Sequence, residues 1–309
     1  MKWFAVCRHA LASLALLVAV SAAAEETFRF FAIGDVPYTA PRQLDELIAR
    51  INHVPSRFTL HVGDIKSGSS LCSDQAFEAV YRQFMSFERA LIYTPGDNEW
   101  TDCHRKNNGP YDPIERLEKL RQIFFGTGKS LGRHPIAVES QSQDAGFHEF
   151  SENLRWHTSG VSFATLHMVG SNNNWQPELP SSSEFGRRNA ANIAWMRSTF
   201  ALAREKGHHA IVFAMQADTS YQDPRAKESG VAEGVGAFLK EAVDWGKPVL
   251  LIQGDTHRFT VDRPFEKRSP AASNVQRVIV PGEQDADVVL IDVDTSNADH
   301  PFSIRLLDR

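Results

Sequence analysis

The sequence has few cysteines, no excess of basic charge and no apolar run long enough to cross a bilayer. Its 33 Lys and Arg residues are outnumbered by 38 Asp and Glu, which gives a formal net charge of -5. Proteins that follow the phosphate backbone of nucleic acid carry a basic face, so this balance argues against a nucleic-acid partner. A hydrophobic share of 42% over 309 residues is enough for a full core, in one large domain or in one domain with insertions.

The N-terminal segment is typical of a cleaved secretory signal. Lys2 and Arg8 precede a short apolar stretch, which runs into the small residues Ser21–Ala24. The apolar stretch is too short to serve as a transmembrane anchor. We therefore expect residues 1–24 to be a signal peptide. The mature chain, residues 25–309, would then be periplasmic or secreted, with no stable membrane anchor after cleavage.

Cysteine use agrees with export. The sequence has three cysteines, of which Cys7 falls within the predicted signal peptide. Cys72 and Cys103 form an even pair, and in an oxidising compartment such a pair predicts a disulfide. The bridge would join the segments that follow Asp64 and Asp97. Two unpaired thiols are the alternative.

Four apolar segments each end in a turn that presents an aspartate. Runs of this length, rich in Val, Ile, Leu and Phe, are typical of buried strands. The four turns are Gly34-Asp35, Gly63-Asp64, Pro95-Gly96-Asp97 and Gly254-Asp255. One such turn is ordinary, because Gly admits positive φ and Asp bonds its own backbone. If the four strands lie parallel in one sheet, all four aspartates meet at its C-terminal edge.

Between and after these strands the sequence alternates helical and strand patterns. Apolar residues at helical spacing predict helices over residues 40–52, about 73–89, 114–125, about 185–206 and about 231–245. Further strands are predicted over residues 161–169, 209–215, 275–280, 288–293 and 302–307, the last three as antiparallel strands that close a second sheet. This order favours an α/β fold with parallel pairing and right-handed crossovers. Residues 126–160 are predicted to be an irregular insertion beside the site.

Asp35, Asp64, Asp97 and Asp255, with the nearby His257, are the candidates for chemistry. Carboxylates gathered at one place repel one another unless cations neutralise them, so the cluster predicts a metal site. Two divalent ions would balance four aspartates, and such a pair can activate water and hold a phosphoryl group. Independent turns with solvated aspartates are the alternative.

Five blocks of this sequence resemble the ordered motifs of calcineurin-like metallophosphoesterases over roughly residues 28–260. The blocks are Gly34-Asp35, Gly63-Asp64, Gly96-Asp97-Asn98-Glu99, Gln216 and Gly254-Asp255-Thr256-His257. The resemblance implies a four-layer α-β-β-α sandwich of two packed sheets flanked by helices. It also implies a two-metal site that hydrolyses phosphoester bonds. Asp35 and His257 would bind the first metal, and Asp64 would bridge the two.

The sequence departs from the family pattern at several positions. Pro37 stands in place of the first block's histidine, and Asp97 in place of an asparagine ligand. Gln216 and Asp255 replace two histidines, so the predicted ligands Asp97, Gln216 and Asp255 all offer oxygen. Oxygen ligands favour Mn, Mg or Ca over Zn. Asn98 replaces the histidine that assists the leaving group; it is the predicted catalytic and substrate-binding contact, but an amide cannot act as a general acid.

Five further residues or segments carry weaker expectations. Arg258 is a candidate substrate-binding residue, with an outward-facing arginine as the alternative. Tyr38 is a candidate phenolate ligand. His61 lies within a strand and is expected to be a core or edge residue. His104 is expected to face solvent, with replacement of the missing acid as the alternative. The run Ser171–Asn174 is expected to be a polar loop that could line a substrate cleft.

These observations predict an exported metal-dependent phosphoric ester hydrolase. It would act on a small phosphorylated substrate by metal-hydroxide attack at a two-metal site. Two alternatives stay open. The first is a catalytically silent protein that keeps the fold and the metals and binds an anionic ligand, and Asn98 is the feature that separates it from the enzyme. The second is an exported binding module with structural metal only. The sequence leaves the oligomeric state undetermined.

Overall fold

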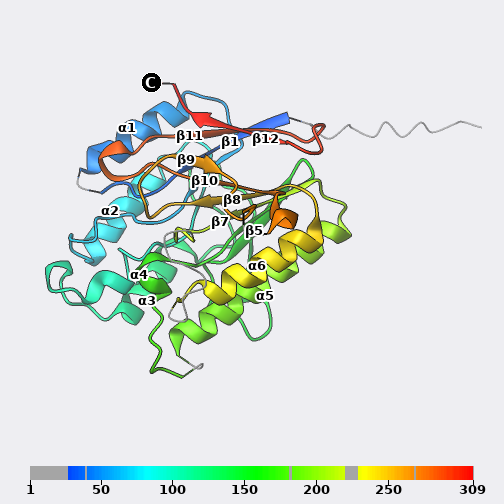
Figure 1. The fold of residues 1–309 in the computed structure, drawn as a ribbon. Coiled ribbons are helices and arrows are strands. Elements are labelled where there is room, and N and C mark those ends of the chain that lie inside the picture. Colours follow the sequence, from blue (N-terminus) through cyan, green and yellow to red (C-terminus); the bar gives the residue numbers. More distant parts are fainter. Residues whose placement is uncertain (1–26, 39, 181–182, 220–228, 268, 309) are drawn as a thin grey trace, which may run out of the picture.

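The computed structural model describes residues 27–38, 40–180, 183–219, 229–267 and 269–308, and the predicted signal peptide 1–24 lies outside them. Two mixed β-sheets pack against each other, and helices cover their outer faces (Figure 1). This is the four-layer α/β sandwich that the sequence predicts. None of the described helices combines the length and hydrophobicity that a membrane crossing requires.

The first sheet has the strand order β12-β11-β1-β2-β3. Its strands are β1 (Thr27–Ile33), β2 (Phe58–His61), β3 (Ala90–Tyr93), β11 (Val289–Asp294) and β12 (Phe302–Leu306). β1, β2 and β3 run parallel, and β11 pairs antiparallel with both β1 and β12. The carboxyl ends of β1, β2 and β3 therefore lie at one edge of this sheet, as the sequence predicts for the first three aspartates.

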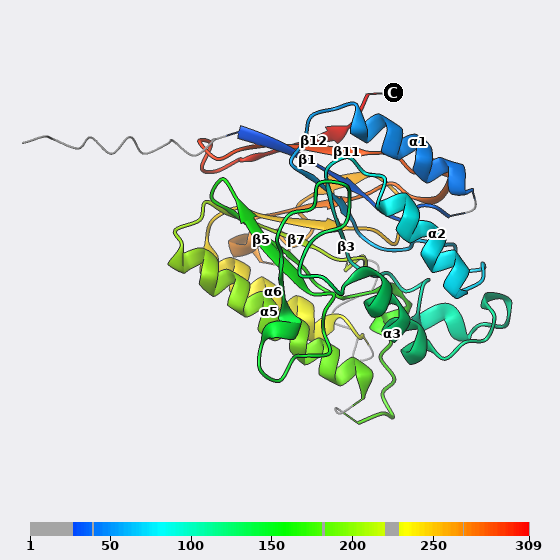
Figure 2. The ribbon, with the colours of Figure 1, turned by 180° about the vertical axis from the view of Figure 1, so that it is seen from behind.

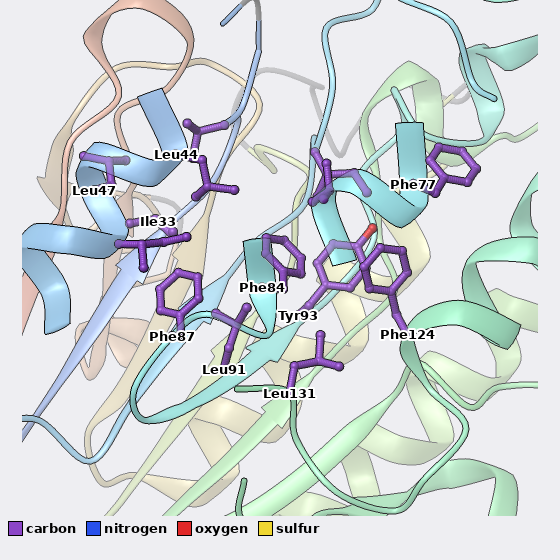
Figure 3. Close-up of a cluster of buried hydrophobic side chains, with 14 of the residues drawn as sticks. Ile33, Leu44, Leu47, Phe77, Phe84, Phe87, Leu91, Tyr93, Phe124 and Leu131 are labelled. Atoms are coloured by element: carbon purple, nitrogen blue, oxygen red, sulfur yellow. The ribbon is translucent and has the colours of Figure 1, made fainter. Parts of the chain in front are cut away.

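Three helices cover the outer face of the first sheet: α1 (Pro41–Asn52), α2 (Asp74–Phe84) and α3 (Pro113–Phe124). Figure 2 shows them along one side of the molecule, and Figure 3 shows the apolar side chains that they bury. Each helix begins with a recognisable signal. Pro41 stands at the start of α1, the Ser73 hydroxyl accepts a hydrogen bond at the start of α2, and the Asp112 carboxylate does so at the start of α3.

The second sheet has the strand order β4-β5-β6-β7-β8-β10-β9. Its strands are β4 (Glu139–Ser140), β5 (Leu154–Thr158), β6 (Val161–Thr165), β7 (Ala210–Ala214), β8 (Val249–Gln253), β9 (Thr260–Asp262) and β10 (Val275–Ile279). β6, β7, β8 and β10 are parallel, and the remaining strands pair antiparallel at the two edges. α5 (Glu184–Glu205) and α6 (Ala232–Trp245) lie side by side over the outer face.

Short helical turns complete the described chain. They are α4 (Gly170–Asn173), η1 (Thr101–His104), η2 (Lys106–Asn108), η3 (Gln141–Gln143), η4 (Pro270–Ala272) and η5 (Glu283–Asp285). η1 and η2 follow β3, and α4 follows β6, so both connections begin at carboxyl ends of parallel strands. Residues between the sheets form the central core, in which the rings of Phe58 and Phe163 meet edge to face with centroids 5.1 Å apart.

Four details differ from the sequence prediction. The strand that precedes Asp255 lies in the second sheet, so the four aspartates come from two sheets. β10 is parallel to β8, while β11 and β12 belong to the first sheet. Residues 126–160 contribute β4 and β5, and α2 ends at Phe84 rather than near residue 89. Alternation along a strand fixes which face is buried but not which strand lies beside it. The edge of β1 that does not pair with β2 pairs with β11, and the sequence pattern does not show this.

Candidate metal centre

The four predicted aspartates meet where the carboxyl ends of the two sheets face each other. Asp35 follows β1, Asp64 follows β2, Asp97 follows β3 and Asp255 follows β8. The first three are buried, with 0%, 2% and 7% of their surfaces exposed. Buried carboxylates are rare unless they are paired or bind metal. The burial of three of them at one place therefore points to a cation site.

The backbone at the site is held in an uncommon conformation. Asp35, Asp64, Asp255 and His257 have positive φ angles of 51°, 55°, 73° and 59°. Non-glycine residues rarely adopt this region, although Asp and His tolerate it better than most. Such conformations persist where the surroundings fix them, and they gather at functional sites. Here they turn four candidate ligands back toward one place.

Asp35, Asp64 and His257 form the first cluster. Each offers a ligand atom, and these atoms lie within 4.8 Å of one another. His257 Nε2 lies 3.2 Å from Asp35 Oδ1, and its Nδ1 lies 3.3 Å from Glu283 Oε2. A histidine that binds metal through one nitrogen usually holds the other on a carboxylate. Glu283 supplies that carboxylate, and the sequence prediction did not include it.

Asp97 and Asp255 face each other around Gly170. A Cβ atom on Gly170 would lie 2.8 Å from Asp97 Oδ1 and 2.9 Å from Asp255 Oδ1. Glycine thus leaves open a space that both carboxylates border. Asp97 Oδ1 and Asp35 Oδ2 are buried without a hydrogen-bond donor among the described residues. Buried acceptors of this kind are costly unless a cation satisfies them, so the residues fit divalent ions that prefer oxygen.

Burial, and after it the charges of neighbouring carboxyls, raises the pKa values of these groups. Burial, followed by the charges of Asp97, Glu99, Asp35 and Asp255, raises the pKa of Asp64 well above its usual range. Burial and Asp102 raise the pKa of Asp97 to about 6. Burial, Asp97 and Asp35 raise the pKa of Asp255 to about 7. A bound divalent cation would favour the charged forms of these carboxyls, so their arrangement suits a cation site.

Two residues fix the position of Asp64. The side-chain amide of Asn98 donates to Asp64 Oδ2 at 2.9 Å, and its backbone N–H donates to Oδ1 at 3.2 Å. Glu99 Oε1 accepts from the Asp64 N–H at 3.2 Å, from the Gly96 N–H at 2.6 Å and from the Tyr93 hydroxyl at 2.8 Å. Glu99 therefore ties together the turns that follow β2 and β3. Glu99 belongs to a predicted block, but its sequence position alone indicated no role of its own.

Gln216 reaches the site with its nitrogen rather than its oxygen. The Gly170 N–H donates to Gln216 Oε1 at 2.6 Å, while Gln216 Nε2 lies 3.3 Å from Asp64 Oδ2. A peptide N–H can only donate, so it fixes which end of the amide faces Gly170. In this arrangement Gln216 donates to the carboxylate of Asp64. The sequence predicted an oxygen ligand here.

A solvent-open cavity of about 500 Å³ lies beside the acidic cluster. Asp97, Asn98 and Asp255 line it, together with Tyr38 and Arg105. Arg105 Nη1 forms an ion pair with Asp102 Oδ2 at 2.6 Å, and nearly half of the arginine side chain is exposed. Arg258 is exposed and is not among the residues that line this cavity. Arg105, which the sequence analysis missed, is thus better placed to meet an anion.

Comparison with solved structures agrees with this architecture. A dimetal phosphatase from Danio rerio superposes with a TM-score of 0.52 at 11% identity, covering 86% of this chain and 95% of that one. The fold is metallophosphoesterase-like. A protein from Streptococcus pneumoniae TIGR4, described as a predicted phosphoesterase, gives a TM-score of 0.34 at 7% identity, covering 93% of this chain and all of that one. No family model and no curated protein matches the sequence.

The two further histidines that the sequence singled out are not in the group of Asp35, Asp64 and His257 that could hold a metal ion. His61 is buried, its Nε2 contacts the Val36 carbonyl at 2.7 Å, and the Gly63 N–H donates to its Nδ1 at 3.2 Å. It is the core histidine that was predicted. His104 is exposed, and its Nδ1 contacts the Thr101 carbonyl at 2.7 Å.

The predicted polar loop does reach the site. Ser171 Oγ lies 2.8 Å from Asp97 Oδ2 and 2.8 Å from Asp102 Oδ1. The four residues Ser171–Asn174 all have positive φ angles, which pull α4 out of regular helical geometry. The loop therefore places a hydroxyl group on a candidate ligand.

The predicted disulfide between Cys72 and Cys103 is present, with the two Cα atoms 5.8 Å apart. Both sulfur atoms lie 3.7 Å from the Asn98 carbonyl oxygen, which also accepts a hydrogen bond from Lys66 Nζ at 2.8 Å. The bridge thus fastens the segment before α2 to the loop that carries Asp97 and Asn98.

Proposed function

We propose that this chain is an exported metal-dependent phosphoesterase that hydrolyses phosphate esters of small molecules. The observation that carries the proposal is the meeting of Asp35, Asp64, Asp97, Asp255 and His257 beside a cavity of about 500 Å³. The metallophosphoesterase-like fold supports the reaction class, because sites of this kind suit displacement at phosphorus. The Cys72–Cys103 disulfide supports export to an oxidising compartment.

We assign the chain's residues to two cation positions. Asp35, Asp64 and His257 would hold one ion, and Asp97 and Asp255 would hold the second, with Asp64 between the two. The set is dominated by carboxylate oxygen, which favours Mn, Mg or Ca over Zn. Two bound cations would lower the pKa of a water molecule and neutralise charge on the phosphoryl oxygens.

The residues around the ions would bind and orient the substrate. Arg105 presents a guanidinium group at the cavity, and guanidinium binds phosphate oxygens through paired hydrogen bonds. Asn98 holds the Asp64 carboxylate in place, and Glu99 accepts a hydrogen bond from the Asp64 backbone N–H. Glu283 holds the His257 ring, so that Nε2 stays turned toward Asp35.

A catalytically silent protein that binds metal and an anionic ligand is the second candidate. The feature in its favour is Asn98, which stands where the related enzymes have a histidine that assists the leaving group. Both candidates predict metal binding, so turnover must separate them.

The decisive experiment is hydrolysis of simple phosphomonoesters and phosphodiesters with Mn²⁺ or Mg²⁺. We expect metal-dependent turnover by the wild type and a loss of at least about 100-fold in Asp64→Asn. Replacing a residue that only holds a metal ligand in place already lowers activity by up to about 100-fold, and Asp64 is itself a candidate ligand. The matched control is Asp299→Asn, which should keep wild-type rates. Asp299 is exposed and is not among the residues that line the cavity. Equal rates in the wild type and Asp64→Asn would remove the enzyme proposal. Metal binding without turnover in either would favour the silent protein.

A further inference from the structure

Asn98 has no hydrogen-bond donor left for a substrate. Its side-chain nitrogen lies 2.9 Å from Asp64 Oδ2 and 3.0 Å from Tyr38 Oη. An amide NH₂ group carries two protons, and these two contacts use both. The residue that stands in the histidine position therefore binds its neighbours, and one of those neighbours is a tyrosine that lines the cavity.

The Tyr38 hydroxyl, in contrast, still has its proton to donate. A phenol has one proton and can also accept hydrogen bonds. Asn98 donates to Tyr38 Oη, and among the described residues no hydrogen bond uses the proton of Tyr38 itself. Because Tyr38 lines the open cavity and its hydroxyl proton is not used elsewhere, the residue can donate a hydrogen bond to a molecule bound there.

The Tyr38 ring is held in position from the side. It meets the His257 ring edge to face, with centroids 5.0 Å apart and planes at 73°. Asn98 links the hydroxyl to Asp64, so contacts to two members of the first cluster, His257 and Asp64, determine where Oη lies. Little reorganisation would be needed when charge develops nearby, and this is the condition under which a hydrogen-bond donor contributes most to catalysis.

We propose that Tyr38 donates a hydrogen bond to the leaving-group oxygen of the substrate. The inference rests on the phosphoesterase function proposed above. In that hydrolysis the oxygen of water forms a bond to phosphorus, the ester P–O bond breaks, and its electron pair remains on the alcohol oxygen. A proton derived from water completes the alcohol. Tyr38 stabilises the negative charge on the departing oxygen, so the substrate class is phosphate esters of unactivated alcohols.

The test compares esters whose leaving groups differ in how much help they need. Tyr38→Phe keeps the ring against His257 and removes the hydroxyl. On an alkyl phosphate we expect kcat to fall by about 10² to 10³-fold, the usual cost of losing one such donor. On nitrophenyl phosphate, whose leaving group is stable as an anion, kcat should change by less than about threefold. Tyr81→Phe, a half-buried tyrosine on α2, is the matched control and should match the wild type on both esters.

Three further readouts separate this role from a structural one. Metal content and melting temperature of Tyr38→Phe should equal those of the wild type. The affinity of metal-loaded protein for inorganic phosphate should also stay unchanged, because phosphate has no leaving alcohol. The wild type alone should show only a weak dependence of kcat on the leaving group, which tests the idea even if the variant fails to fold.

Each contrary result overturns the inference in a recognisable way. An equal loss on both esters would make Tyr38 a structural residue, and loss of a metal ion would make it a ligand. No loss on the alkyl ester, or a steep dependence on the leaving group in the wild type, would also overturn it. A wild type that hydrolyses no ester would refute the proposed function itself, and this inference with it.

Discussion

Gly170 has no side chain at the place where the carboxylates of Asp97 and Asp255 face each other. In Gly170→Ala the new methyl group would lie less than 3 Å from both Oδ1 atoms. We expect this variant to lose one bound divalent ion per chain, because the methyl group fills the space that the two carboxylates share. Metal analysis after dialysis measures the effect.

The matched control for that change is Gly236→Ala in α6, where an added Cβ meets nothing within 4 Å. It should keep both ions and gain up to about 1 kcal/mol of stability from better helix propensity. Full metal content in Gly170→Ala would contradict the assignment of Asp97 and Asp255 to one ion.

His61 makes the stability of the protein depend on pH. Burial lowers its pKa to about 4. Its Nε2 donates to the Val36 carbonyl and its Nδ1 accepts from the Gly63 N–H, so the folded ring carries one proton. Because this value lies below about 6.5, the unfolded chain binds a proton between the two values that the folded chain does not. The contribution of His61 to the free energy of unfolding is fully present above about pH 6.5. It is lost as the pH falls toward 4, by an amount on the order of 3 kcal/mol.

Urea unfolding of the wild type and His61→Gln at neutral and acidic pH checks this. The variant keeps a donor for the Val36 carbonyl but cannot bind a proton, so its stability should fall less on acidification. His300→Gln, at an exposed histidine, should behave like the wild type. Identical pH profiles for all three proteins would show that His61 is not the group responsible.

Two residues at the site, Glu283 and Arg105, were not predicted from the sequence. Glu283 follows β10 and Arg105 follows η1, and neither lies in a block that resembles the family. Glu99 and Gln216 do lie in such blocks, but sequence spacing shows only that a side chain is near the site and not which of its atoms face inward. The aspartates were predictable because each closes a recognisable strand.

At the scale of elements, the disulfide joins two connections that carry site residues. It closes a loop between positions 31 residues apart, and by the chain-entropy estimate such a loop contributes about 3 to 4 kcal/mol. Replacing both cysteines by serine should lower the free energy of unfolding by that amount. It should also lower turnover, because the bridge holds the loop of Asp97 and Asn98.

Chemical denaturation of the double variant and of the reduced wild type measures this contribution, and the two should agree. Unchanged stability in both would mean that the loops are held by the remaining contacts alone, such as the Lys66 bond to the Asn98 carbonyl.

Helices and strands were largely predictable, whereas the partners of strands were not. The amphipathic spacing of their apolar residues predicted that α1, α2 and α3 exist, whereas the end of α2 was placed about five residues too late. β11 and β12 have the same alternation as any half-buried strand. Their place beside β1 depends on which edge the rest of the fold leaves open, and that information is not local.

At the scale of the whole molecule, the site exists because two sheets meet. Three aspartates belong to connections of the first sheet and Asp255 to the second. The apolar layer between the sheets, with Phe58 and Phe163 in contact across it, fixes the relation between them. The central claim is therefore that carboxylates carried by two packed sheets gather around divalent cations.

Calorimetric titration of the metal-stripped protein with Mn²⁺ tests that claim most directly. The account predicts two ions bound per chain by the wild type, with weakened binding in Asp64→Asn and unchanged binding in Asp299→Asn. The absence of saturable binding by the folded wild type would contradict it.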